Sequence, residues 1–275
     1  MLPAATTRRL APSPGWSART LSDLWAYREL LYFLVWRDVK IRYKQTVLGA
    51  AWAIIQPLMT MVVFTIFFGH LAKIPSDGLP YPVFSLAALV PWTYFTSALG
   101  GGTASVGSYQ HIISKVYFPR LLIPMAAVAA PLVDFAIAFG VLLAIMAWYG
   151  IAPGLQIVWL PALTLLAVAT SAAASVWLSA LNVRYRDIRY VVPFCLQLWM
   201  FATPVAYPAS LVPERWRALY GLNPMAGVIE GFRWALVGGR PPGLMTLWSA
   251  LVVVVALAGG VVYFRRSEGT FADII

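Results

Sequence analysis

A basic segment runs without interruption into a long apolar segment over residues 42–60, RYKQTVLGAAWAIIQPLMT, and this junction constrains the fold more than any other feature. Arg42 and Lys44 suit an inner membrane surface, because lysine and arginine flank the cytoplasmic ends of membrane helices. Gly49 permits close helix approach, and Pro57 can bend a helix. We therefore expect a membrane-spanning helix that is anchored at its cytoplasmic end.

Composition excludes a soluble protein. Hydrophobic residues make up 61% of the chain and charged residues only 11%, whereas a soluble surface requires about a quarter charged. The single cysteine, Cys195, rules out a disulfide within the chain. Residues 1–16 have no apolar core, so we expect no cleavable signal peptide.

Five apolar stretches are long enough to cross a hydrocarbon core of roughly 30 Å; they cover residues 47–71, 83–106, 121–149, 157–181 and 244–264. We interpret the shorter, proline-rich stretch at 191–207 as a sixth span. Residues 204–242 are interpreted as a re-entrant helix pair, because irregular backbone at membrane depth requires a covering of protein or water. A folded external loop is the alternative. The predicted fold is an all-α, six-span membrane domain over residues 47–264 with a tail at 265–275.

Most of the 20 lysines and arginines fall before the first span, between alternate spans and after the last. The positive-inside rule then places both termini in the cytoplasm of a multi-pass plasma-membrane protein. This topology accounts for the net charge of +10, so we expect no nucleic acid partner.

Residues 21–46, after a flexible cytoplasmic N-terminus at 1–20, have the features of an interfacial helix and a basic foot. Thr20 and Asp23 fit a capping box, and Trp25 and Trp36 are interface-seeking aromatics. We expect an amphipathic helix in the inner headgroup plane that positions a cytoplasmic partner. A simple membrane anchor is the alternative.

Few residues suggest chemistry. No glycine precedes a lysine, so a P-loop is absent, and His70 and His111 lack metal-ligand spacing. Asp134 lies in an apolar run and should face a helix interface or a cavity rather than lipid. The three glycines at 100–102 favour close helix packing or a hinge over a phosphate site.

The cytoplasmic loop at 108–120 carries more apolar residues than a connector needs. A short helix there would present aliphatic and aromatic side chains to a cytoplasmic groove, with Pro119 ending it. A loop lying on the membrane surface is the alternative.

Four blocks of the sequence together resemble a known family: RYKQTVLGAAWAIIQPLMTMVVFTIFFG, SKVYFPRLLIP, LNVRYRDIRYVVPF and LNPMAGVIEGFRWAL. In order and spacing they are similar to the type-2 permease subunits of ABC exporters for bacterial polysaccharides, and the resemblance covers roughly residues 21–266. It implies a homodimer of this chain, membrane lipids around it, and two copies of a separate ABC ATPase. ATP and magnesium would bind the ATPase, so this chain would bind no cofactor. The implied cargo is undecaprenyl-linked polysaccharide, with O-antigen preferred to teichoic acid or capsule.

The resemblance also assigns roles to residues of this sequence. The interface helix, 24–37, would contact the ATPase through Trp25, Arg28, Trp36 and Arg37. The coupling loop, 107–120, would transmit its movement through Tyr109, Gln110, His111, Ile112, Ile113, Lys115, Val116, Tyr117 and Phe118. Residues 211–237 would form the re-entrant helices.

Pores of this family are lined by the first and fifth spans. On the first span, helical spacing aligns a stripe that we call the α-stripe, Trp52, Gln56, Met59, Val63 and Phe67. The α-stripe would contact a glycan, or else form a subunit interface. Lys40, Arg42 and Lys44 would attract a lipid pyrophosphate headgroup, although membrane topology explains their positions equally well.

Two other functions remain open. A permease for drugs or small lipids would share the spans and docking loops. A membrane enzyme would need a polar cluster at one face, for which the candidates are Glu214, Arg215, Arg217, Glu230 and Arg233; Glu230 and Arg233 are more simply an i, i+3 ion pair. The sequence does not identify the sugar repeat, a terminal cap, the partner of Asp134 or the helix faces along the path.

Overall fold

The computed structural model describes residues 25–44, 49–113, 115, 118–213, 215–216, 220–239, 241 and 243–274. Within these ranges the regular elements are all helical. Three predicted features lie outside the described residues: the N-terminal segment 1–20, the cap residues Thr20 and Asp23, and the start of the first span at residue 47.

Five helical segments are long and apolar enough to cross a membrane: Trp52–Leu71, Tyr81–Ser108, Leu122–Trp148, Leu155–Arg184 and Thr246–Phe271. They correspond to the five long stretches predicted from the sequence. The predicted sixth span is helix α9, Ile188–Phe201, with 14 residues. At 1.5 Å per residue such a helix is about 21 Å long, which is shorter than the hydrocarbon core.

The first segment begins after an irregular turn and ends in unusual helix. Gly49 adopts a φ of 46°, which a glycine accepts without strain, and starts the 3-10 turn η1, Gly49–Ala51. Helix α3, Trp52–Phe64, contains Pro57 and continues into the π-helical η2, Thr65–Leu71. A π-helix of this length is rare.

Helix α4, Tyr81–Ser108, is the centre of the bundle and is followed by the short helix α5, Gln110–Ile113. The third apolar stretch is two helices, α6, Leu122–Ala129, and α7, Leu132–Trp148. The division falls at Pro131, which has no N–H to continue the ladder.

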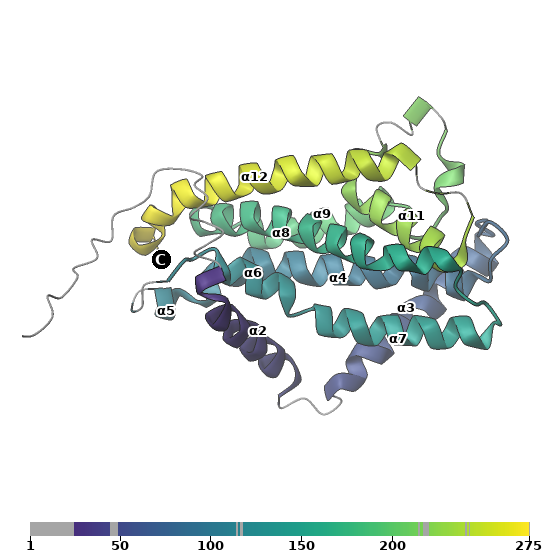
Figure 1. Cartoon of the computed structure of the whole chain (residues 1–275), viewed down its shortest axis with the longest axis horizontal. Coiled ribbons are helices and arrows are strands. Elements are labelled where there is room, and N and C mark those ends of the chain that lie inside the picture. Colours follow the sequence, from purple (N-terminus) through teal and green to yellow (C-terminus); the bar gives the residue numbers. More distant parts are fainter. Residues whose placement is uncertain are drawn as a thin grey trace, which may run out of the picture.

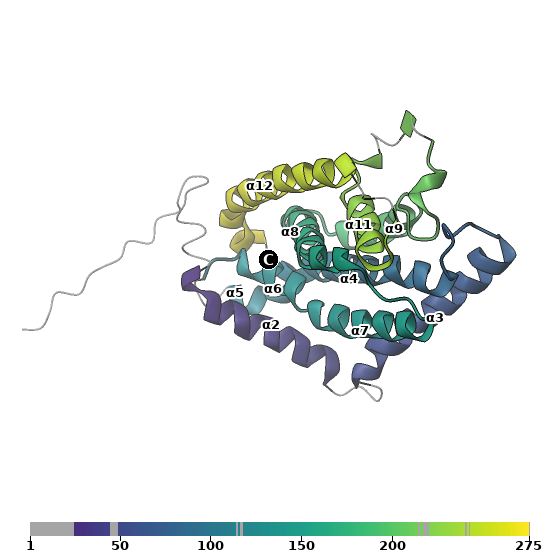
Figure 2. The same cartoon turned by 45° about the vertical axis from the view of Figure 1, so that its right-hand side comes forward.

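The second half packs around α4. Turn η3, Leu155–Trp159, leads into α8, Leu160–Arg184. After α9 come η4, Ala209–Leu211, the helix α11, Pro224–Val237, and the long α12, Gly243–Ile274. Figures 1 and 2 show α4 and α8 running side by side, with α12 along α8 and α7 on the other side of α4.

The molecule has two distinct ends (Figure 1). The α5 end holds α5 and the last turns of α12, and the α11 end holds α11 and the turn between η2 and α4. Helix α2, Arg28–Tyr43, lies at an angle to the long helices near the α5 end (Figure 2).

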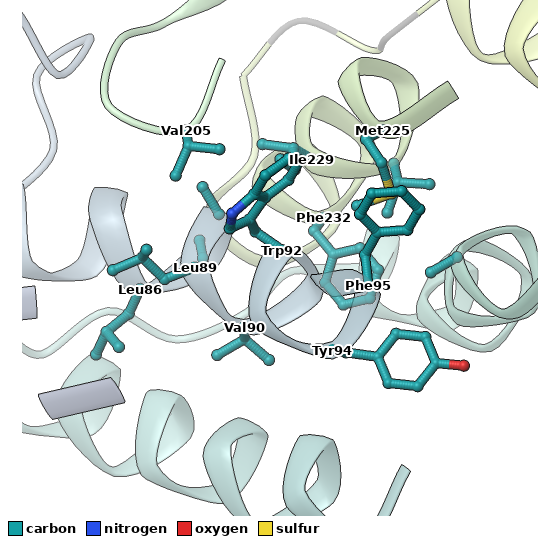
Figure 3. Close-up of a cluster of buried hydrophobic side chains, with 14 of the residues drawn as sticks. Leu86, Leu89, Val90, Trp92, Tyr94, Phe95, Val205, Met225, Ile229 and Phe232 are labelled. Carbon is teal, nitrogen blue, oxygen red and sulfur yellow. The ribbon is translucent and has the colours of Figure 1, made fainter. Parts of the chain in front are cut away.

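The main core joins α4 to α11. Figure 3 shows side chains of α4, among them Trp92 and Phe95, beside Ile229 and Phe232 of α11. All four are buried, and the ring of Phe95 also meets the ring of Trp199 on α9 edge-to-face, with centroids 5.1 Å apart. This packing fixes α11, although α11 is too short to span.

Small residues bring the long helices together. A Cβ on Gly102 of α4 would collide with Ser175 of α8, and one on Gly260 of α12 would lie 2.7 Å from the Trp177 ring. Trp177 Nε1 also donates a 2.8 Å hydrogen bond to the carbonyl of Ala256. The prediction of close packing at the glycine run 100–102 is therefore confirmed at Gly102, whereas Gly100 has open space around it.

The predicted tail at 265–275 is helical as far as Ile274, because α12 continues past Phe264. The rings of Phe264 and Phe271 pack edge-to-face with centroids 5.3 Å apart. Both are buried in a second core cluster with Leu34 of α2. Contacts with the rest of the chain thus order the last turns.

Candidate functional site

The segment that follows α4 is hydrogen-bonded to α2. Tyr109 is buried, and its hydroxyl donates to Oδ1 of Asp38 at 2.7 Å. The guanidinium carbon of Arg37 lies 4.0 Å from the centroid of the Tyr109 ring. Burial raises the pKa of Tyr109, and the hydrogen bond and charge of Asp38 raise it further. The phenol therefore remains a protonated donor.

The predicted coupling loop is divided between buried and exposed side chains. Ile113 and Phe118 are buried in the cluster that contains Leu34, Phe264 and Phe271. They attach the loop to its own chain, instead of projecting toward a partner as the sequence suggested.

Four other candidate residues of the coupling loop face outward. Gln110, His111, Ile112 and Lys115 are exposed. Val116 and Tyr117 lie outside the described residues. The surface that a partner can reach here is therefore more polar than the sequence of the loop suggested.

The predicted interface helix keeps most of its candidate residues exposed. Trp25, Trp36 and Arg28 are exposed, and Arg37 is half-buried. Arg28 donates to the carbonyl of Trp25 at 3.2 Å, with its guanidinium 5.4 Å from that ring. Only Leu34 of α2 is fully buried, so α2 rests on the bundle through a narrow contact.

Asp134 has two partners, both in the last turn of α2. Arg42 forms an ion pair with its Oδ2, and the hydroxyl of Tyr43 donates to Oδ1. Burial, followed by the contact with Asp134, raises the pKa of Tyr43 to about 12, so Tyr43 stays a donor. The prediction that Asp134 faces a helix interface is confirmed, and its unknown partner is α2.

This ion pair changes the role expected of the basic foot. Lys40 and Lys44 are exposed, whereas Arg42 is already neutralised by Asp134. Lys40 and Lys44 are therefore better placed than Arg42 to meet an anionic headgroup.

A polar cavity of about 170 Å³ lies beside the ion pair, between the start of α3 and helices α4 and α7. Its polar lining comes from Arg42, Gln56, Thr93, Ser97 and Asp134. Gln56, from the α-stripe, thus borders a space with a mixed polar and apolar lining inside the bundle.

The α-stripe itself has almost no covering within the chain. All five residues are exposed, and Trp52, Met59 and Phe67 are each more than half exposed. Only 11% of the most apolar window of this span is buried, against 78% for α4. The structure thus places the α-stripe together on an outer face of the bundle.

At the α11 end, Asn223 connects α9 to α11. Its Oδ1 caps α11 by accepting from the backbone N–H of Met225 at 3.1 Å, and it also accepts from Trp199 Nε1 at 2.9 Å. Its amide nitrogen donates to Thr203 Oγ1 at 2.9 Å. An asparagine cap followed by proline was a visible helix-start signal in the sequence, but its link to α9 was not.

Arg233 of α11 also connects several segments at the same end. It donates to Glu230 Oε1 at 3.0 Å and to the carbonyls of Val205 and Tyr207 at 2.8 and 3.3 Å. Its guanidinium carbon lies 3.7 Å from the centroid of the Phe84 ring. The predicted Glu230 and Arg233 ion pair is confirmed.

The rest of the proposed enzyme cluster is not assembled by the described residues. Arg215 is exposed, with its guanidinium 5.8 Å from the Trp216 ring, and Glu214 and Arg217 lie outside the described residues. No three His, Cys, Asp or Glu side chains in the described ranges gather to hold a metal ion.

Comparison with known proteins agrees with this architecture. The family described as ABC-2 type transporter matches residues 29–237. The chain is 32% identical over 263 residues to the O-antigen export system permease protein RfbA of Myxococcus xanthus, which covers 94% of this chain and 99% of that protein. It is 27% identical over 252 residues to the RfbA protein of Klebsiella pneumoniae, covering 90% and 95%. It is 23% identical over 239 residues to the polysialic acid transport protein KpsM of Escherichia coli, covering 84% and 91%.

Proposed function

Because the chain belongs to the ABC-2 type transporter family, we propose that it is the permease subunit of an ATP-driven exporter that moves undecaprenyl-linked polysaccharide, with O-antigen as the cargo, across the plasma membrane. The observation that carries this proposal is the 32% identity to an O-antigen export permease across 99% of that protein. The similarity extends over the long helices and both ends of the bundle, so it is not confined to one motif.

In the proposed complex, two copies of this chain pair with two copies of a cytoplasmic ABC ATPase, which binds the ATP and magnesium. Exposed side chains of α2 and of the coupling loop meet the ATPase. Because Tyr109 bonds to Asp38, a displacement of the coupling loop is passed to α2. Because Arg42 and Tyr43 bond to Asp134, α2 passes it to α7 and the adjoining start of α3.

The topology we propose has six crossings with both termini in the cytoplasm. Helix α9 and the segment that follows it make the fifth crossing, and α11 returns into the membrane before α12 makes the sixth. Figure 1 supports this arrangement, because α5 and the end of α12 lie at one end of the bundle. Burial of α11 against α4 also supports a position inside the membrane domain. Helix α2 then lies in the inner headgroup layer.

The path we propose runs along the α-stripe of the two subunits. Aromatic faces on Trp52 and Phe67 suit sugar rings, and the Gln56 amide can hydrogen-bond to hydroxyl groups. A Gln56 side chain exposed to lipid would be costly, which supports a partner or an aqueous space beside it. No bond in the glycan changes during transport.

Depletion of the protein in its host tests this proposal. Lipid extracts are analysed for undecaprenyl-linked polymer, and the polymer's membrane side is probed with a lectin that does not cross the membrane. Full-length polymer should accumulate on the cytoplasmic face, and the wild-type gene should restore export. Unchanged lipid-linked glycan would contradict polysaccharide export and favour a permease for drugs or small lipids.

A further inference from the structure

The α11 end contains a cavity of about 610 Å³ that the transport path does not use. Its polar and aromatic lining includes Asp77, Ser210, Tyr220, Glu230, Arg233 and Trp234. The turn between η2 and α4, the η4 segment and the second half of α11 thus meet around one space. Its volume falls in the range of roughly 300–1,000 Å³ that is usual for small-ligand sites.

Arg233 forms part of the wall of this cavity. Arg233 is 6% exposed, and its buried Nε has no hydrogen-bond partner among the described residues. The other guanidinium nitrogens are held by Glu230 and two backbone carbonyls. These bonds hold the guanidinium in one orientation beside the cavity.

The other polar groups are already oriented. Ser210 Oγ donates to Asp77 Oδ1 at 3.1 Å, and the hydroxyls of Tyr207 and Tyr220 are 2.7 Å apart. Trp234 packs near Trp159 with ring centroids 6.5 Å apart. The cavity therefore combines fixed carboxylates, hydroxyls and an aromatic ring, which suits a ligand that carries many hydroxyls and also has apolar C–H faces.

Charge restricts the ligand further. Among the described residues that line the cavity, the carboxylates of Asp77 and Glu230 face a single cation, Arg233. That cation is already paired with Glu230. The charges of the described lining residues therefore disfavour additional negative charge, so they suit an uncharged occupant better than a phosphate, a pyrophosphate headgroup or an acidic glycan.

We propose that this cavity is a saccharide site that binds a short, uncharged segment of the exported glycan at the outer side of the membrane. The proposal rests on the function and orientation proposed above, and it narrows the substrate class to glycans without a high density of negative charge. Binding here would hold the leading sugars after they leave the path, so that they do not slip back.

Cysteine protection in the complete complex with its ATPase tests the site. Cys195 is exposed, so Cys195→Ser provides a background in which Ser210→Cys is the reactive thiol. A maleimide that does not cross membranes is applied from outside, with the polysaccharide released by mild acid from the host envelope as the probe. The probe should slow labelling several-fold, whereas polysialic acid oligomers should not.

The matched control is Leu211→Cys in the same background, because Leu211 is exposed but does not line the cavity. Its labelling should be indifferent to either glycan. Adding Trp234→Phe to Ser210→Cys should keep part of the protection, and adding Trp234→Ala should remove it. Adding Asp77→Asn, which keeps the shape and tolerates the φ of 51° at this position, should allow polysialic acid to protect.

Equal labelling of Ser210→Cys with and without the host polysaccharide would overturn the saccharide site. Equal protection by polysialic acid before the Asp77→Asn change would overturn it as well. The lectin assay on the wild-type complex is read in parallel: export without protection contradicts only this site, and absence of export contradicts the proposed function itself.

Discussion

The hydroxyl of Tyr109 lies 2.7 Å from Oδ1 of Asp38, so the segment between α4 and α5 is bonded to the middle of α2. Tyr109 lies in the coupling loop and Asp38 directly follows the interface helix at 24–37, and we assign both of these segments to ATPase contact. The hydrogen bond therefore joins the coupling loop to α2. A displacement of either segment by the ATPase would also displace the other.

Tyr109→Phe removes this bond and keeps the ring, its packing and its contact with Arg37. A hydrogen bond to a charged group contributes about 1.5–3 kcal/mol, so we expect transport per ATP hydrolysed to fall several-fold while the complex still assembles. Export and ATP hydrolysis are measured together in proteoliposomes. Ser108→Ala is the control, because Ser108 is exposed and bonds only within α4 in the described structure. A proportional loss of hydrolysis and export would contradict a coupling role.

Asp134→Ala should lower the melting temperature of the purified complex by several degrees. It leaves Arg42 and Tyr43 without their shared acceptor, at a cost of about 1–3 kcal/mol. The charge exchange Arg42→Asp with Asp134→Arg should recover part of the loss, and Lys40→Ala on the same helix should have little effect. Melting is followed by fluorescence-detected size exclusion. If the exchange is no better than the single change, the two side chains are not acting as a pair.

The long membrane helices could be predicted from sequence because burial in lipid leaves a continuous apolar run. The sequence predicts the stretch 121–149 as one uninterrupted span, whereas the structure divides it into α6 and α7 at Pro131, which has no N–H for the helix ladder. The sixth span was harder, because α9 is short and the chain after it is held by side chains such as Asn223. Those hydrogen bonds depend on which segments meet in space, and the length of an apolar run does not predict these contacts.

The contacts of the candidate functional residues were also hard to predict from the sequence, because they depend on which segments meet in space. Arg42 and Asp134 lie 92 positions apart, and each alone resembles an ordinary basic flank or a buried acid. Ile113 and Phe118 looked like docking residues because an apolar loop residue can cover either a partner or its own chain. The structure buries them in the cluster that contains Leu34 and Phe271, which the periodicity of so short a segment could not predict.

Gly102→Leu should reduce the amount of folded protein in the membrane and lower its melting temperature. A side chain there would collide with Ser175, and overpacking costs about 1–3 kcal/mol. Gly100→Leu in the same helix is the control, because nothing lies within 4 Å of a Cβ at Gly100. Ser175→Gly should rescue Gly102→Leu in part. Equal effects of the two leucines would indicate that helix flexibility, rather than close packing, matters in this run.

Met59→Cys in the Cys195→Ser background should cross-link two copies of the chain if the α-stripe faces its symmetry mate. Met59 is 59% exposed, so its thiol would be free to meet the second copy. Leu165→Cys is the control, since Leu165 on α8 is also exposed and lies outside the α-stripe.

The reaction of Gln56→Cys with a charged thiol reagent then distinguishes a glycan path from a closed subunit interface at the α-stripe. Reaction together with the Met59 cross-link would indicate a hydrated path between the subunits, and a cross-link without reaction would indicate a sealed interface. Absence of both the Met59 cross-link and the Gln56 reaction would place the α-stripe against lipid. The glycan path would then have to lie elsewhere in the protein.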